Sequence, residues 1–224
     1  MESKKIIIAI DGPAGAGKTT IAKALSKQLD ILYLNTGALY RAYGLKCLDN
    51  KLNANSLETA SNLSQSTVID VKYIDGAQHT ILDGVDVTDR LYDEGVSGLA
   101  STISKHDVIR QSLKNIQQKI ASNQSVIMDG RDIGSVVLPM ADYKFYLDAD
   151  VEVRAKRRWL ELKTKDDNIL YEDVLREIKE RDHNDITRDL SPLVKCKDAI
   201  TIDCTNLGVN QVVDLFLKYI KKEI

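Results

Sequence analysis

Residues 12–20 combine three glycines, one lysine and two threonines within nine positions. They fit the pattern G-x-x-x-x-G-K-[ST] and stand between an apolar run and a helical pattern, as a phosphate-binding loop requires. Glycines let successive backbone N–H groups turn toward an anion, and the helix that follows adds its positive N-terminal end. We therefore expect Lys18 to reach the outer phosphates of a nucleoside triphosphate and the Thr19 hydroxyl to complete a Mg²⁺ shell. The residues expected to hold this nucleotide are Gly12, Pro13, Ala14, Gly15, Ala16, Gly17, Lys18, Thr19 and Thr20.

Transfer of a phosphoryl group is catalysed mainly by cations placed around that group, so arginines should converge from several segments. Arg131 and Asp132 follow an apolar run, at the carboxyl end of a predicted strand, where open α/β sheets bind ligands. Asp129 could hold Mg²⁺ or its waters there, or it could cap a turn. Thr36 likewise follows a predicted strand and could be a helix N-cap, a ligand contact, or both.

A second group of basic residues belongs to a predicted helical hairpin. Arg154, Arg157 and Arg158 fall on a helix that Asp148 or Asp150 should cap. A polar loop at 163–168 leads back into a helix that begins near 171. Helix, loop and helix with arginines on both arms are typical of a lid, although an ordinary charged hairpin would have the same pattern.

The elements that must position these residues alternate between strand and helix. Short apolar runs are separated by helical patterns, such as those at 18–29 and 209–221. This alternation predicts an α/β fold with a doubly wound, five-stranded parallel sheet. The expected strands are 5–10, 31–34, 125–128, 143–148 and 199–203.

One region departs from this alternation. Residues 67–88 contain alternating apolar runs separated by Asp75-Gly76 and Asp83-Gly84, which predicts a small antiparallel β insertion. The insertion could extend one edge of the fold or form a movable substrate-binding part, and the pattern alone favours neither.

Composition narrows the classes of partner. The 224 residues carry a net charge of −2, which gives no general attraction to nucleic acid or to a membrane. Three cysteines form neither a paired framework nor a metal-binding spacing, and no signal peptide is recognisable. We expect a cytoplasmic monomer with no nucleic-acid or membrane partner. The motifs of GTPase switches are missing, because Gly130 follows Asp129 too early for a D-x-x-G motif.

These segments together resemble bacterial cytidylate kinases, a branch of the nucleoside monophosphate kinases, over nearly the whole chain. The most specific segments are residues 129–134, which read D-G-R-D-I-G, and 177–182, which read E-I-K-E-R-D. Residues 35–41, Arg188 and the phrase Ser191-Pro192-Leu193 also match. Asn35 departs from the pattern, since aspartate stands there in relatives.

The resemblance implies a P-loop kinase that uses ATP and Mg²⁺ to phosphorylate CMP, and dCMP as well. It implies one core over 1–224, with a monophosphate-binding region at 36–120 and a lid at 154–170. In this family, the positions that match Thr36, Arg110 and Asp132 face the cytosine ring. Those that match Ser101, Arg181 and Asp185 lie near the ribose. Those that match Arg41, Arg131 and Arg188 lie near the acceptor phosphate. The residues expected to be catalytic are Lys18, Arg131, Arg157, Arg181 and Arg188, with Thr19 and Asp129 at the metal.

Two alternatives stay open. The same scaffold could serve another small-molecule kinase that acts on UMP, AMP or an acid such as shikimate. It could also serve a non-catalytic nucleotide-binding regulator, although no switch motif or partner tail favours that class.

Overall fold

The computed structural model describes residues 5–164 and 166–220, which fold as two compact units. One unit joins the residues up to Ile31 with those from Ser125 onward, and the other is Leu32–Gln124. Residue 165 of the expected polar loop and residue 221 of the expected last helix lie outside the described residues.

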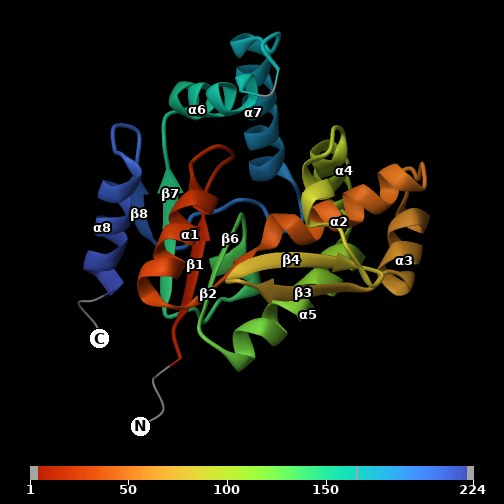
Figure 1. Cartoon of the computed structure of the whole chain (residues 1–224), viewed down its shortest axis with the longest axis horizontal. Helices are drawn as coiled ribbons and strands as arrows, with labels where there is room; N and C mark the ends of the chain where they lie inside the picture. The colour runs from red at the N-terminus through yellow and green to blue at the C-terminus, as the bar shows by residue number, and fades with distance from the viewer. Residues whose placement is uncertain (1–4, 165, 221–224) are drawn as a thin grey trace. The chain divides into compact units, whose positions relative to one another are not determined.

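The first unit holds the phosphate-loop segment and most of the sheet. Its helices α1 and α8 lie beside the strands, and α6 and α7 form a hairpin at one end (Figure 1). Its elements are β1 (Ile7–Asp11), α1 (Lys18–Leu29), β6 (Val126–Gly130), the short π-helix η2 (Ile133–Val137), β7 (Tyr143–Asp148), α6 (Val151–Lys163), α7 (Tyr171–Thr187), β8 (Ile200–Asp203) and α8 (Val209–Ile220).

The sheet has five strands in the order β2-β6-β1-β7-β8, which confirms the predicted α/β fold. β1 pairs in parallel with β6 on one side and with β7 on the other, and β8 extends the sheet beyond β7. Strands are therefore added in both directions from β1, and the loop after β1 lies at the switch point where such sheets bind ligands. Ile8, Ala9 and Ile10 are fully buried, as expected for a central parallel strand.

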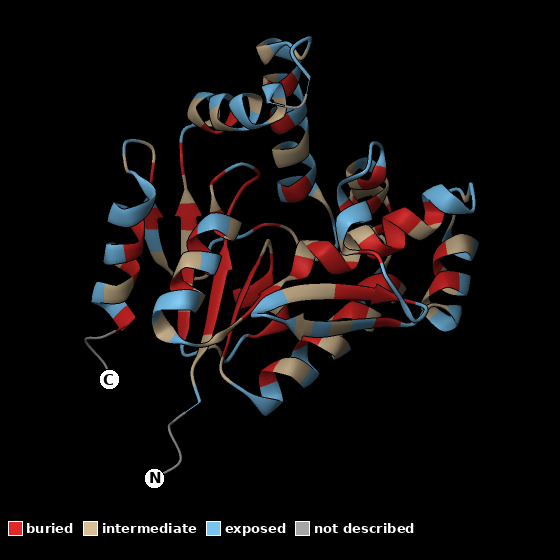
Figure 2. Ribbon diagram, in the orientation of Figure 1, coloured by how far each residue is buried: buried red, intermediate tan, exposed pale blue. Residues whose placement is uncertain are grey.

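The hairpin of α6 and α7 has a small apolar core of its own. Ala155 packs with Val174 and Ile178, and the indole N–H of Trp159 donates to the carbonyl of Ile169 at 2.9 Å. Asp150 caps α6 by accepting from the N–H of Glu152, as one of the two predicted caps. Figure 2 shows that intermediate and exposed residues cover most of this hairpin, in contrast to the buried strands.

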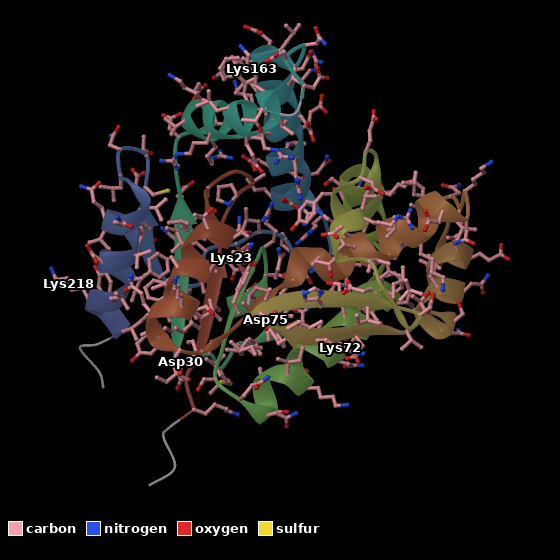
Figure 3. The ribbon with its side chains drawn as sticks, in the orientation of Figure 1. Lys23, Asp30, Lys72, Asp75, Lys163 and Lys218 are labelled. Atoms are coloured by element: carbon pink, nitrogen blue, oxygen red, sulfur yellow. The ribbon has the colours of Figure 1, made fainter. Side chains whose placement is uncertain are left out.

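The second unit carries the β insertion, and the predicted antiparallel sheet is present. Asp75 stands at the turn between its first two strands (Figure 3) and has a positive φ of 50°. The elements are β2 (Leu32–Asn35), α2 (Thr36–Asp49), α3 (Leu57–Ser66), β3 (Ile69–Ile74), β4 (Ala77–Leu82), β5 (Val85–Asp86), the 3₁₀-helix η1 (Thr88–Tyr92), α4 (Val96–Ile103) and α5 (Asp107–Asn123).

Helices α2 and α4 approach each other closely in this unit. A Cβ at Gly44 would come within 2.8 Å of the Val96 carbonyl oxygen and the Ala100 nitrogen, so only glycine permits this contact. Buried Leu39, Tyr43 and Ile103 belong to the surrounding apolar core. The close packing holds α4 against the first half of the unit.

The N-cap of α2 corrects one expectation. Asn35, and not Thr36, is the cap: its Oδ1 accepts from the N–H of Ala38 at 3.2 Å. Asparagine has the short side-chain oxygen that an N-cap needs, so the departure from aspartate preserves the cap. Thr36 is the first residue of the helix and is buried.

No helix within the described parts of the chain has the length and apolar character needed to cross a membrane.

Candidate active site

The loop between β1 and α1 presents backbone N–H groups at the start of a helix. α1 begins at Lys18, and its N-cap is Gly17, which has a φ of 90° and no side chain that could cap the helix. The first N–H groups of α1 are therefore available to an anion, which the helix dipole also favours. This is the geometry that the G-x-x-x-x-G-K-[ST] pattern predicts.

Lys18 lies folded against its own loop. Its Nζ donates to the carbonyl oxygens of Gly12 at 2.7 Å and Pro13 at 2.6 Å. Burial lowers the pKa of the Lys18 ammonium well below its usual value, and the charge of Arg131 lowers it further. A bound phosphate would favour the charged form, so the site is built to gain stability when an anion arrives.

Thr19 and Asp129 bring a hydroxyl and a carboxylate together. The Thr19 hydroxyl donates to Asp129 Oδ2 at 2.9 Å, and Asp129 is buried at the end of β6. Hydroxyl and carboxylate oxygens suit Mg²⁺, which usually takes few protein ligands and completes its shell with phosphates and water. Among residues 5–164 and 166–220, no group of three or more His, Cys, Asp or Glu side chains could hold a metal by itself. The pair thus fits a metal that arrives with a nucleotide.

Arginines from two segments meet at Asp185. Its Oδ2 accepts from Arg131 Nε at 2.6 Å, and its Oδ1 accepts from Arg188 Nη1 at 3.4 Å. Burial alone would raise the pKa of Asp185, but the two guanidinium groups hold it below its usual value. Asp185 was expected to lie near the ribose. In the structure it orients Arg131 and Arg188, which were expected near the acceptor phosphate.

This arginine cluster belongs to the same site as the phosphate loop. The pKa of Lys18 responds to the charges of Arg131, Asp129, Asp185 and Arg181, so all four lie near its ammonium group. Residues from α1, β6 and α7 therefore converge as the sequence predicts. Such a concentration of positive charge fits an anion that carries several phosphates.

Arg157, expected to be a catalytic residue of the lid, contacts the segment that follows β8. Its Nη2 donates to the carbonyl of Cys204 at 2.7 Å and to that of Thr205 at 3.4 Å. The Cys204 thiol in turn donates to the carbonyl of Ala16 at 3.3 Å. Arg157 is thus connected to the phosphate loop through the segment that follows β8.

Asp11 is a site residue that the sequence interpretation missed. It is buried at the end of β1, and its two carboxylate oxygens accept from the N–H groups of Ile133 and Gly134, both at 2.8 Å. Burial raises the pKa of Asp11 to about 6. These bonds fix the segment after Asp132, which is itself buried. In the sequence, its signal is an acidic residue that ends an apolar run directly before the glycine-rich loop.

Three predicted residues of the second unit, Arg41, Ser101 and Arg110, belong to α4 or contact it or its C-cap. Arg41 Nε donates to the Ser97 hydroxyl at 3.4 Å, and its guanidinium carbon lies 5.0 Å from the centroid of the Tyr92 ring. Arg110, which is buried, donates from Nη1 to the carbonyl of Ser104 at 3.2 Å. Ser101 lies on α4 between these two anchor points.

The comparisons with known proteins agree with one another. The family model for cytidylate kinase matches residues 8–222. The chain is 49% identical over 225 residues to a cytidylate kinase of Caldicellulosiruptor saccharolyticus, covering 99% of this chain and all of that protein. It is 44% identical over 218 residues to a cytidylate kinase of Clostridium botulinum strain Loch Maree, covering 97% and 99%.

The chain belongs to the cytidylate kinase family. This confirms the resemblance and the class of enzyme, a phosphotransferase whose acceptor is a phosphate group. Among solved structures, an uncharacterized protein from Eubacterium ventriosum matches with a TM-score of 0.55 at 16% identity, over 97% of this chain and 99% of that one. TT1252 from Thermus thermophilus matches with a TM-score of 0.50 at 17% identity, over 99% of each chain. At these identities the two structures support the fold alone.

Proposed function

We propose that this member of the cytidylate kinase family transfers the γ-phosphoryl group of ATP directly to the 5′-phosphate of CMP, and of dCMP as well. Membership of the cytidylate kinase family supports the class of reaction, phosphoryl transfer to a phosphate group. The cluster of Arg131, Asp185 and Arg188, of which Arg131 and Asp185 act on the pKa of Lys18, supports the mechanism because it fits a second anion site beside the phosphate loop.

The donor nucleotide would bind through the phosphate loop. N–H groups of the loop and the first turn of α1 surround its phosphates, and Lys18 exchanges its two carbonyl partners for phosphate oxygens. Thr19 and Asp129 would hold Mg²⁺, which when bound neutralises charge on the transferring group.

The acceptor would be held by the residues that the family resemblance assigns to it. Arg131 and Arg188 bind the acceptor phosphate while Asp185 keeps them in position, and Arg41 and Arg181 add positive charge. Thr36, Arg110 and Asp132 read the cytosine. A carboxylate accepts from its exocyclic amine, and an arginine donates to its acceptor atoms. Ser101 would lie at the ribose.

Transfer needs no covalent enzyme intermediate. An anionic oxygen of the acceptor phosphate attacks the γ-phosphorus, that P–O bond forms, the bond to the β-phosphate oxygen breaks, and ADP leaves. The cations offset the repulsion between two anions, which is the main task of the protein. The helical hairpin, with the proposed lid at 154–170, would exclude water when it closes.

We further propose a cytoplasmic monomer. Cys47, Cys196 and Cys204, all within the described residues, are free thiols, as expected in a reducing compartment. Its partners are then small nucleotides and not nucleic acid or a membrane.

A steady-state comparison of acceptors tests the proposal. ADP release is measured with CMP, dCMP, UMP and AMP in the presence of ATP and Mg²⁺, with wild type and with Lys18→Ala. CMP and dCMP should give the highest kcat/KM, and Lys18→Ala should lower turnover by about 10³-fold because a charge-stabilising group is lost. Near-normal turnover of the variant would contradict the role of the loop, and a preference for UMP or AMP would contradict the choice of acceptor.

A further inference from the structure

Both backbone polar groups of Ala14, in the phosphate loop, are hydrogen-bonded to side chains of the helical hairpin. Its N–H donates to Asp182 Oδ1 at 3.1 Å, and its carbonyl accepts from Arg154 Nη1 at 2.8 Å. Arg154 and Asp182 also form an ion pair, with 2.5 Å between Nη1 and Oδ2. The three groups close a ring of hydrogen bonds in which the loop is one member.

The same contacts divide the loop into two parts. Pro13 has no N–H, and the N–H of Ala14 is engaged by Asp182, so the N–H groups free to turn toward a phosphate begin at Gly15. A Cβ at Gly15 would lie 3.2 Å from Arg154 Cβ, so the loop lies directly against α6. Arg154 and Asp182 therefore hold the outer side of the loop and leave its inner side to the ligand.

Because Arg154 and Asp182 are largely buried, the stability of their ion pair depends on its hydrogen-bond geometry. The side chains of Arg154 and Asp182 are 7% and 13% exposed. Charges removed from water in this way cost free energy unless their hydrogen bonds are satisfied. Arg154 meets that condition by also donating from Nε to the carbonyl of Ala149 at 2.8 Å. A shift of the loop would break several of these bonds at once.

The pair is not needed to hold the helical hairpin together. Ala155, Val174 and Ile178 pack the two helices, and Trp159 bonds across to Ile169. Lys163, at the outer end of α6 (Figure 3), lies 4.8 Å from the centroid of the Trp159 ring. The apolar core joins α6 to α7 without the ion pair, and the rings of Trp159 and Tyr171 also meet across the hairpin, with 6.3 Å between their centroids. The specific contribution of Arg154 and Asp182 is therefore their contact with the loop.

We propose that Arg154 and Asp182 are positioning residues that preset the phosphate loop for the donor nucleotide. Arg154 comes from α6 and Asp182 from α7, so the shape of the loop depends on both arms of the hairpin. The inference rests on the proposed function, in which this loop binds the phosphates of ATP.

Binding measurements with a matched control test it. The variants are Asp182→Asn, Arg154→Met and the double substitution. The controls are Asp173→Asn and Arg176→Met, which remove an ion pair with the same 2.5 Å separation, centred on α7, whose side chains are 53% and 67% exposed. Dissociation constants for ATP and for CMP are measured separately by calorimetry, together with Tm.

We expect each variant to bind ATP about tenfold more weakly and CMP within about twofold of wild type, because only the loop loses its partners. The double variant should bind ATP no more weakly than the worse single variant, since the residues act as one unit. The controls should change neither constant.

Unchanged affinity for ATP, equal losses for ATP and CMP, or additive losses in the double variant would overturn the proposal. If Arg154→Met fails to fold, Arg154→Lys replaces it as the test. Lysine keeps the positive charge but cannot donate the several hydrogen bonds of a guanidinium group, so the affinity of this variant for ATP should fall between those of wild type and Asp182→Asn. A wild-type protein that fails to bind ATP or to phosphorylate CMP would instead contradict the proposed function.

Discussion

Gly12 is the position at which the site depends most directly on a single missing carbon atom. Its φ is 151°, and a Cβ placed there would come within 2.0 Å of the Leu147 carbonyl oxygen. Leu147 is fully buried in β7, which pairs with β1 on one side and β8 on the other. The neighbouring backbone therefore cannot move aside without disturbing two ladders of the sheet.

The loss of stability expected for Gly12→Ala can be estimated by comparison with a second glycine, Gly76. Gly76, in the turn of the β insertion, also has a positive φ of 76°, but nothing lies within 4 Å of its missing Cβ. Gly76→Ala should lower the free energy of unfolding by about 1 kcal/mol, the usual strain of alanine at positive φ. Gly12→Ala adds a backbone clash to that strain and should cost about 3 to 5 kcal/mol.

Urea unfolding of wild type and both variants measures these costs. ATP binding should separate the variants as well, because Gly12 begins the loop whereas Gly76 lies in the other unit. Gly76→Ala should bind ATP as wild type does, and Gly12→Ala should bind it at least tenfold more weakly, as its displaced loop predicts. If both variants lose the same stability, the clash with Leu147 is not the reason that glycine stands at position 12.

Two further predictions concern buried aspartates. The raised pKa of Asp11, about 6 against an ordinary 3.8, means that the folded protein holds the extra proton between these values, so the contribution of Asp11 to stability falls as pH rises from 4 to 6. The free energy of unfolding of wild type relative to Asp11→Asn should therefore drop by roughly 2 kcal/mol between pH 4 and pH 7, whereas a flat difference would contradict the shift. Asp132→Ala should weaken CMP binding and leave ATP binding little changed, which separate titrations check, and equal losses would contradict a role in reading the base.

The parts of the fold and site that could be predicted are those that depend on residues close together in the sequence. The strand before the phosphate loop, the helix at 18–29 and the hairpins at the two Asp-Gly pairs each depend on residues adjacent in the sequence. The proximity of Thr19 and Asp129 was also predictable, because Asp129 stands at the carboxyl end of β6 and Thr19 lies in the first turn of the helix that follows the adjacent parallel strand β1.

The partners of individual side chains were not predictable. Asp185 was expected at the ribose, but its bond to Arg131 depends on where α7 lies relative to the end of β6, whereas its bond to Arg188 is local, three residues along the chain. Arg157 was expected to be a catalytic residue of the lid, and its bonds to Cys204 depend on the path of the chain after β8. Spacing along one helix determines which face a residue occupies but not which distant segment that face meets.

The carboxylates in this site explain how so many cations can lie together before a phosphate is present. Lys18, Arg131 and Arg181 are close enough for the positive charges of the two arginines to lower the pKa of Lys18, so alone they would repel. Asp129 and Asp185 oppose that effect, and Asp185 holds two guanidinium groups by direct bonds. The cations therefore stand in place before the substrates bind, and the reorganisation that a flexible set of arginines would require at the moment of transfer is avoided. On this view Asp185 serves the reaction through Arg131 and Arg188, which makes the acidic residues of the site as necessary to phosphate binding as the basic ones.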